Sequence, residues 1–415
     1  MVIADAVVAP ESAAAGFIGR IPVRNIWLLM LYASDLFRKA GPTRVDVERN
    51  PDEIADLVAE LLAQAVEERQ RQQLSFGYRS RTADLSRVRG RIDVLRTERR
   101  QLLARGAVAC LFLELSVDTP RNRYVRGALE AVARLVTRPD LRHRCRRLAA
   151  DMQAQGVAGA MPSRAELSAD RIGRHDAKDS EMLAAAMLAM DLVLPTERAG
   201  ARPLPMPERE EQWARRLFER AVGGFYRTVL PRERWRVRTG GLLDWPIDWW
   251  TEGARDILPG MQTDVVLDDA LATRRIVIDT KFTSIVTTGW RGETKLRSGY
   301  LYQIYSYIRS QAGRSSPLAD NAEGLLLHPA IGEMFDEAVS LHGHLIRFAT
   351  VDLAADSGAI REQLLKLTLQ FKEETDHGNH VRAKAYPVRS GTTRCGPREE
   401  PGKSLDRRRE RAYVV

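Results

Sequence analysis

The chain has 415 residues, of which 44% are hydrophobic and 29% are charged, and this is enough for two or three folded domains. The formal net charge is +9, a basic balance that suits a polyanionic partner without proving one. Cys110, Cys145 and Cys395 form no Cys-x-x-Cys pair, which argues against a disulfide framework or a zinc ribbon. The apolar runs are too short to cross a bilayer and no basic leader precedes one, so we expect a cytoplasmic protein without membrane contact.

The first half of the chain predicts helices around a small β subdomain. Residues 1–20 are alanine-rich and irregular, as in a loose leader, and residues 21–194 follow as an N-terminal region. Within this region, Asn50-Pro51-Asp52-Glu53 is a typical helix start because Asn can cap the helix and Pro suits its first turn. Between about residues 76 and 117, apolar residues recur at every second position instead of at the spacing of a helix, which predicts strands there.

The second half predicts a mixed sheet flanked by helices. Four prolines mark residues 195–207 as a linker. Residues 208–375 then form one domain, and residues 387–415 are predicted to be a disordered basic tail. The whole chain is therefore expected to be α/β, with an α+β N-terminal half. The expected strands of the second half lie near 234–239, 243–249, 262–268, 274–282, 323–328 and 344–351, and its helices near 208–228, 298–311 and 358–374.

The chemistry of the second half centres on two aspartates and a lysine. Met261 to Phe282 reads as a β-hairpin, and its antiparallel register would bring Asp264 close to Asp279 across the ladder. Side chains alternate along a strand, so Asp279 and Lys281 point the same way. Two carboxylates can hold Mg²⁺ or Mn²⁺, and the lysine can position or activate a water or neutralise charge in the transition state. The alternative is a surface hairpin with an ordinary Asp–Lys ion pair.

Two further helices contribute candidate residues. Glu219 lies at the rim of the apolar stripe of the helix that precedes the hairpin, from where it could reach the two aspartates. Gln303 and Tyr307 are four residues apart, so they share one face of a helix that follows the hairpin. Taken alone, Glu219 is better explained as a solvated helix glutamate and the Gln303–Tyr307 pair as aromatic helix packing. The combination of these features in this order is much harder to obtain by chance.

This order of motifs resembles the PD-(D/E)xK nuclease superfamily, in particular its branch with a Gln-x-x-x-Tyr helix. Residues 21–372 as a whole resemble the McrC family, the nuclease subunits of McrBC restriction systems. Thr263 stands where the superfamily often has proline, which is not a ligand. Besides the nuclease motif, the resemblance rests on Ile21-Pro22-Val23-Arg24-Asn25-Ile26, Leu31-Tyr32-Ala33, Gly90-Arg91-Ile92-Asp93 and Val117-Asp118-Thr119-Pro120-Arg121-Asn122-Arg123.

The resemblance implies a restriction-endonuclease-like fold and Mg²⁺- or Mn²⁺-dependent cleavage of DNA that contains methylcytosine. It also implies a partner, a McrB-like hexameric AAA+ GTPase that binds the GTP and whose hydrolysis this chain stimulates. The sequence agrees, because it contains no Gly-x-x-x-x-Gly-Lys-Ser/Thr loop of its own. The residues proposed to contact the partner are Arg87, Arg89, Arg91, Asp118, Arg121 and Asn122.

Three alternatives stay open at this point. The arginines near residue 90 could simply form a solvated strand face. The chain could be a regulatory subunit that activates a partner ring without cutting, although the intact acidic pair argues against this. It could also be a stand-alone RecB-like nuclease, which the McrC-like N-terminal half argues against.

Overall fold

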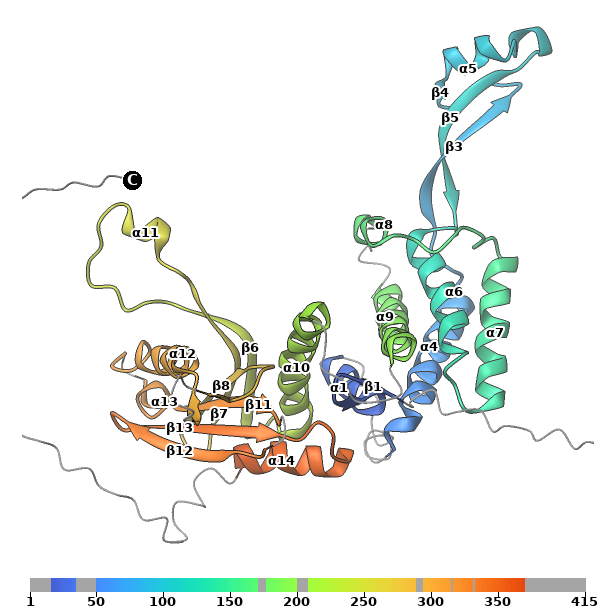
Figure 1. The fold of residues 1–415 in the computed structure, drawn as a ribbon. Helices are drawn as coiled ribbons and strands as arrows, with labels where there is room; N and C mark the ends of the chain where they lie inside the picture. Colours follow the sequence, from blue (N-terminus) through green and yellow to red (C-terminus); the bar gives the residue numbers. More distant parts are fainter. Residues whose placement is uncertain are drawn as a thin grey trace, which may run out of the picture. The chain divides into compact units, whose positions relative to one another are not determined.

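The computed structural model describes residues 16–34, 50–170, 177–199, 208–288, 294–314, 316–330 and 333–369 (Figure 1). Met1–Gln370 form one compact unit, and the predicted tail at 387–415 lies outside the described residues. The predicted α/β class is confirmed, since helices accompany both a small antiparallel sheet and a larger mixed sheet. No helix among the described residues is long and apolar enough to cross a membrane.

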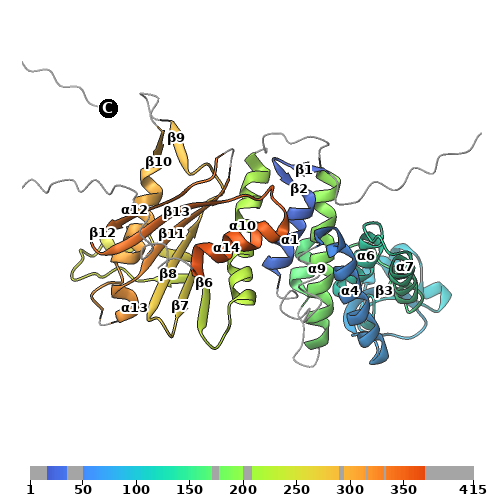
Figure 2. The ribbon, with the colours of Figure 1, turned by 90° about the horizontal axis from the view of Figure 1, so that it is seen from below.

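The chain begins with a short β-hairpin and a buried helix. The end of the predicted leader forms β1 (Phe17–Ile18), which pairs with β2 (Ile21–Pro22), and α1 (Val23–Ala33) follows directly. Helix α1 is buried on nearly all sides, with Arg24 exposed, because it packs between α9 (Ala177–Arg198) and α10 (Glu208–Val229) (Figure 2). Pro195 lies within α9, so the predicted linker begins inside a helix, and residues 200–207 are not described.

Polar side chains of α1 tie it to distant parts of the chain. Asn25 is fully buried, and its Nδ2 donates hydrogen bonds to the backbone oxygens of Leu353 at 2.8 Å and Ala355 at 2.9 Å. The indole nitrogen of Trp27 donates to the backbone oxygen of Leu192 at 3.0 Å. The N-terminal block that resembles McrC therefore packs into both halves of the protein.

Four helices pack together in the rest of the first half. Helix α4 (Ile54–Arg71) starts after the short 3₁₀ turn η1 (Pro51–Glu53), as the Asn50-Pro51 pair predicted. It packs against α9, α6 and α7. The remaining helices of this group are α6 (Pro120–Val132), α7 (Pro139–Ala154) and the short α8 (Arg164–Ala169).

The predicted β subdomain is a three-stranded antiparallel sheet, here called the arm (residues 77–116). Strand β5 (Val108–Ser116) pairs with β3 (Gly77–Leu85) on one side and with β4 (Arg91–Ile92) on the other. Within the stretch predicted to form strands, β4 is only two residues long because Asp93 instead caps α5 (Val94–Arg99), its Oδ1 accepting a hydrogen bond from Arg96 N at 3.0 Å. A 3₁₀ turn, η2 (Leu103–Arg105), leads from α5 towards β5.

The second half is a six-stranded mixed sheet in the order β12-β13-β11-β8-β7-β6. Strand β11 runs parallel to β8 and β13, and the other pairs are antiparallel. The two strands expected at 234–239 and 243–249 are a single strand followed by a loop. The strands of this half are β6 (Trp235–Leu243), β7 (Met261–Asp269), β8 (Arg274–Thr280), β9 (Val286–Thr288), β10 (Thr294–Leu296), β11 (Glu323–Pro329), β12 (Asp336–Leu341) and β13 (His344–Val351), and its other helices are α11 (Ala254–Ile257), α12 (Ser298–Arg309), α13 (Pro317–Asp320) and α14 (Ser357–Leu369).

Helices α10 and α12 pack on opposite faces of this sheet. Ile304 and Ile308 of α12 pack in one core cluster with Val277 of β8, whereas Gly223 of α10 lies against Val265 of β7. Val277 and Val265 face opposite sides, since Val265 pairs with the residue after Val277. The next residue of α10, Gly224, has no room for a Cβ because the backbone of α1 crosses there. The sheet is therefore held between α12 and the α1–α10 pair.

Candidate active site

The candidate site lies where β7 and β8 separate. Their regular pairing ends at Val265 and Ile278. Beyond that point, Asp264 Oδ2 accepts hydrogen bonds from both the backbone nitrogen and the hydroxyl of Thr280, each at 2.7 Å. The carboxylate thus satisfies a backbone donor that would otherwise bond to a neighbouring strand. The expected closeness of Asp264 to the Asp279-Thr280 pair is observed.

Asp279 and Lys281 form a buried ion pair. The Nζ of Lys281 lies 2.7 Å from Asp279 Oδ2, and the two residues are 5% and 1% exposed. No described residue gives Asp279 Oδ2 a hydrogen bond of suitable geometry. Burial raises the pKa of Asp279 to about 6, with Lys281 pulling it down and Asp264 pushing it further up. The charge of Asp279 is therefore only partly compensated within the chain.

Glu219 of α10 belongs to the same electrostatic cluster. Burial is the main cause that raises the pKa of Glu219, and the negative charge of Asp264 is the next. Lys281 and Asp279 also act on it, in opposite directions. Glu219 and Asp264 line one cleft of ≈ 250 Å³ together with Tyr32 of α1 and Arg220 and Arg227 of α10. The cleft gives water and small ions access to the carboxylates.

The pair on α12 approaches the site from the other face of the sheet. Gln303 Nε2 donates to the Tyr307 hydroxyl at 2.6 Å, as their four-residue spacing predicted. Burial is the main cause that raises the pKa of Tyr307, and the charges of Asp279 and Asp264 raise it as well. Tyr307 is thus within electrostatic reach of both aspartates.

The donor set fits a hard divalent cation. Asp264 and Asp279 offer carboxylate oxygens, and Asp279 Oδ2 is a buried oxygen whose close partner is the Lys281 ammonium at 2.7 Å. No group of three His, Cys, Asp or Glu side chains in the described ranges is arranged to hold a metal. A cation here would keep several waters or substrate oxygens as ligands, which is the coordination that Mg²⁺ prefers.

Tyr300 is a neighbour of Lys281 that the sequence did not reveal. Lys281 Nζ lies over the Tyr300 ring, 5.3 Å from its centroid. Tyr300 precedes Gln303 by three residues and Tyr307 by seven, so all three share one face of α12. This spacing was the available signal, but aromatic residues on a helix are usually explained by core packing.

The six residues predicted to contact a partner fall into two groups. Arg87, Arg89 and Arg91 are exposed on the arm, and the Arg89 guanidinium lies 4.3 Å from the centroid of the Phe112 ring. Asp118, Arg121 and Asn122 are at most 6% exposed, so these three side chains are not available to contact a partner. The second group instead holds the base of the arm to the helices.

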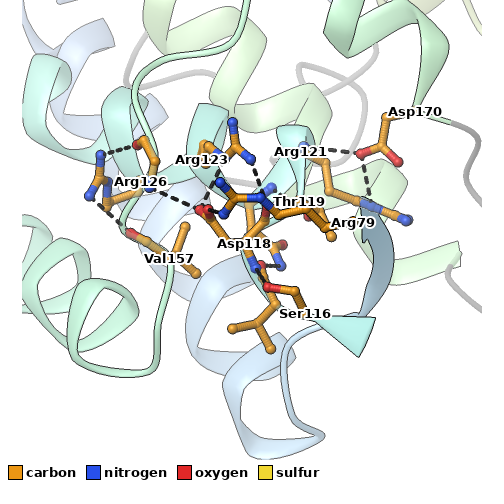
Figure 3. Close-up of polar contacts among 12 residues, drawn as sticks. Arg79, Ser116, Asp118, Thr119, Arg121, Arg123, Arg126, Val157 and Asp170 are labelled. Carbon is orange, nitrogen blue, oxygen red and sulfur yellow. Dashed lines mark hydrogen bonds and ion pairs between the residues drawn. The ribbon is translucent and has the colours of Figure 1, made fainter. Parts of the chain in front are cut away.

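The buried group is held by contacts within the chain (Figure 3). Asp118 pairs with Arg79 of β3 at 2.7 Å and with Arg123 of α6 at 2.9 Å. Arg121 pairs with Asp170 at 3.1 Å. It also pairs with Asp179 of α9 at 3.0 Å. Asn122 Nδ2 donates to the backbone oxygens of Ser75 and Val117. These polar and charged residues, which the sequence suggested were on the surface, therefore stabilise the fold.

Fold and site together define an α/β protein with a buried carboxylate–lysine site at the separation of two strands. Residues 11–190 match the family described as the McrBC 5-methylcytosine restriction system component. The matched stretch includes α1 and the arm and ends before α10.

One known protein matches the sequence over most of its length, and two solved structures match it weakly. The type IV methyl-directed restriction enzyme EcoKMcrBC of Escherichia coli K12 is 23% identical over 350 residues, covering 84% of this chain and 97% of that protein. A half-complex from a tetradecameric assembly of Thermococcus gammatolerans McrB AAA+ hexamers with bound McrC matches with a TM-score of 0.36 and 16% identity, covering 83% of this chain and 76% of that one. The T. gammatolerans McrBC complex matches with a TM-score of 0.27 and 16% identity, covering 44% and 60%.

Proposed function

We propose that this chain is the DNA-cleaving subunit of a modification-dependent restriction system in the cytoplasm. It would hydrolyse phosphodiester bonds in methylcytosine-containing DNA, using Mg²⁺ or Mn²⁺ and driven by a partner GTPase. The observation that carries the proposal is the convergence of Asp264, Asp279 and Lys281 at one buried point beside an open cleft. The family match over residues 11–190 supports the restriction context.

Each residue of the site has a distinct task in this proposal. Asp264 and Asp279 would hold the cation, which when bound polarises a phosphate oxygen and activates a water. Lys281 places a buried positive charge where negative charge grows as a phosphodiester is attacked. Glu219 lines the cleft beside Asp264 and can orient a water there. Gln303 fixes the Tyr307 hydroxyl against the opposite side of the site.

The partner would be a McrB-like AAA+ GTPase hexamer that binds the GTP. The chain contains no phosphate-binding loop of the Gly-x-x-x-x-Gly-Lys-Ser/Thr type, so GTP must be bound elsewhere. The arm carries the exposed arginines together with large apolar side chains such as Tyr78 and Leu95, each 77% exposed. Exposed apolar residues on a projecting sheet favour a protein contact over a solvated one. The arm is therefore the proposed contact with the ring.

The test is a cleavage assay with methylated DNA, Mg²⁺, GTP and the partner. We expect Asp264→Asn, Asp279→Asn and Lys281→Met each to lower the cleavage rate about a hundredfold or more. Asp248→Asn is the matched control, because Asp248 is an exposed aspartate in the loop after β6 and should cut like the wild type.

Two outcomes would favour the competing functions. The absence of product with every divalent metal would favour a regulatory subunit that does not cut. Rapid cutting by the isolated chain without GTP would favour a stand-alone nuclease.

A further inference from the structure

The ammonium group of Lys281 has two different neighbours. Asp279 Oδ2 lies 2.7 Å from Nζ, and Nζ lies over the Tyr300 ring, 5.3 Å from its centroid. Lys281 is 5% exposed, so little water is available to replace either neighbour. A desolvated ammonium over an aromatic face is held more strongly than an exposed one.

Tyr300 is held in place by groups other than Lys281. Its hydroxyl lies 3.3 Å from the Thr283 hydroxyl, and its ring centroid lies 5.7 Å from that of His328. His328 is fully buried, and its Nδ1 lies 2.8 Å from the backbone oxygen of Thr283. That oxygen can only accept a hydrogen bond, so Nδ1 carries the hydrogen. Thr283 and His328 thus fix the ring before any ligand binds.

The proposed metal site creates a conflict for Lys281. The oxygen that pairs with its ammonium, Asp279 Oδ2, belongs to one of the two carboxylates proposed to hold the cation. Two positive charges that share one carboxylate repel each other, and the buried ammonium needs compensation from another group. The Tyr300 ring is the group in contact with Nζ that carries no net charge and is not needed by the cation.

We propose that Tyr300 is a positioning residue, whose ring keeps the Lys281 ammonium in the site while Asp279 is shared with a divalent cation. The inference rests on the proposed function, because it assumes that Asp264 and Asp279 bind the cation. It adds a residue that the Asp-x-Lys and Gln-x-x-x-Tyr motifs do not contain. The ring lowers the cost of bringing a second positive charge to Asp279.

The test is a titration of the full-length protein with Mn²⁺ alone, which measures metal affinity without any activity. We expect Tyr300→Leu to weaken Mn²⁺ binding by about tenfold, because the ammonium depends more on the ring once Asp279 is shared with the cation. Tyr300→Phe keeps the ring face and should bind like the wild type. Tyr302→Leu makes the same substitution at a residue of α12 that is 66% exposed, and it should change nothing.

A double-mutant cycle separates positioning from simple packing. In a Lys281→Met background, Tyr300→Leu should leave Mn²⁺ affinity unchanged within about twofold, because no ammonium remains to be held. Equal weakening in both backgrounds, or no weakening in the wild-type background, would overturn the proposal. A different result would show that the proposed metal site itself is wrong: Asp279→Asn would then bind Mn²⁺ as tightly as the wild type. Melting temperatures of all variants verify that they are folded.

Discussion

Raising the pH of the metal-free protein from about 5 to about 8 should lower its stability through Asp279. The pKa of this carboxyl is raised from 3.8 to about 6 in the folded chain, chiefly by burial. The folded state therefore binds the proton more tightly than the unfolded state. Stability from this group is fully present below pH 3.8 and is lost as the pH rises through about 6.

The size of the effect follows from the two pKa values. Full ionisation of Asp279 lowers the free energy of unfolding by about 3 kcal/mol. Between about pH 5 and about pH 8, the decrease is about 1.4 kcal/mol. The assay is urea denaturation in EDTA of the wild type and Asp279→Asn at several pH values. The difference in unfolding free energy between them should change by about this amount, with the wild type losing more as the pH rises.

Asp248→Asn is the control, and its difference from the wild type should not follow pH in this window, because Asp248 is exposed. Saturating Mg²⁺ should oppose the trend, since the cation binds the ionised carboxylate. A pH-independent difference between wild type and Asp279→Asn would refute the reasoning about Asp279.

Three further predictions concern packing and partner contact. Gly224→Ala should destabilise the fold by about 2 kcal/mol, because its Cβ would overlap the backbone of α1, whereas Gly253→Ala has open space and should be neutral in the same denaturation assay. Asp118→Asn should cost about 2 kcal/mol by weakening two ion pairs at the base of the arm, while Asp84→Asn, whose pairs are more exposed, should cost less than about 1 kcal/mol. Arg89→Glu should reduce stimulation of the partner's GTP hydrolysis and leave Mn²⁺ binding unchanged, and stimulation equal to wild type would remove Arg89 from the contact.

The hairpin of the site could be predicted because its signals are local. Apolar alternation marks both strands, and a short turn between them sets the register that brings Asp264 to Thr280. The spacing of Gln303 and Tyr307 likewise sets their contact within a single helix. Interactions between residues close in sequence produce a regular spacing of residue types, which can be recognised in the sequence itself.

Other features depend on packing between distant segments, which leaves no such pattern. Asp118 and Arg121 were predicted to be surface residues because they are charged, yet they are buried against arginine and aspartate partners from other elements. Strand β12 is mostly exposed and polar, so it lacks the apolar alternation that marks a half-buried strand. The contact of Gly224 with α1 joins segments almost two hundred positions apart, where only the folded chain shows why glycine is needed.

The most direct test of the proposed function measures DNA cleavage and GTP hydrolysis in one reaction. The reaction contains methylcytosine DNA, Mg²⁺, GTP, the partner ring, and either wild-type protein or Asp279→Asn. We predict that the variant stimulates GTP hydrolysis as the wild type does and yields no cleaved DNA. Cleavage by the variant at the wild-type rate would contradict the assignment of the site.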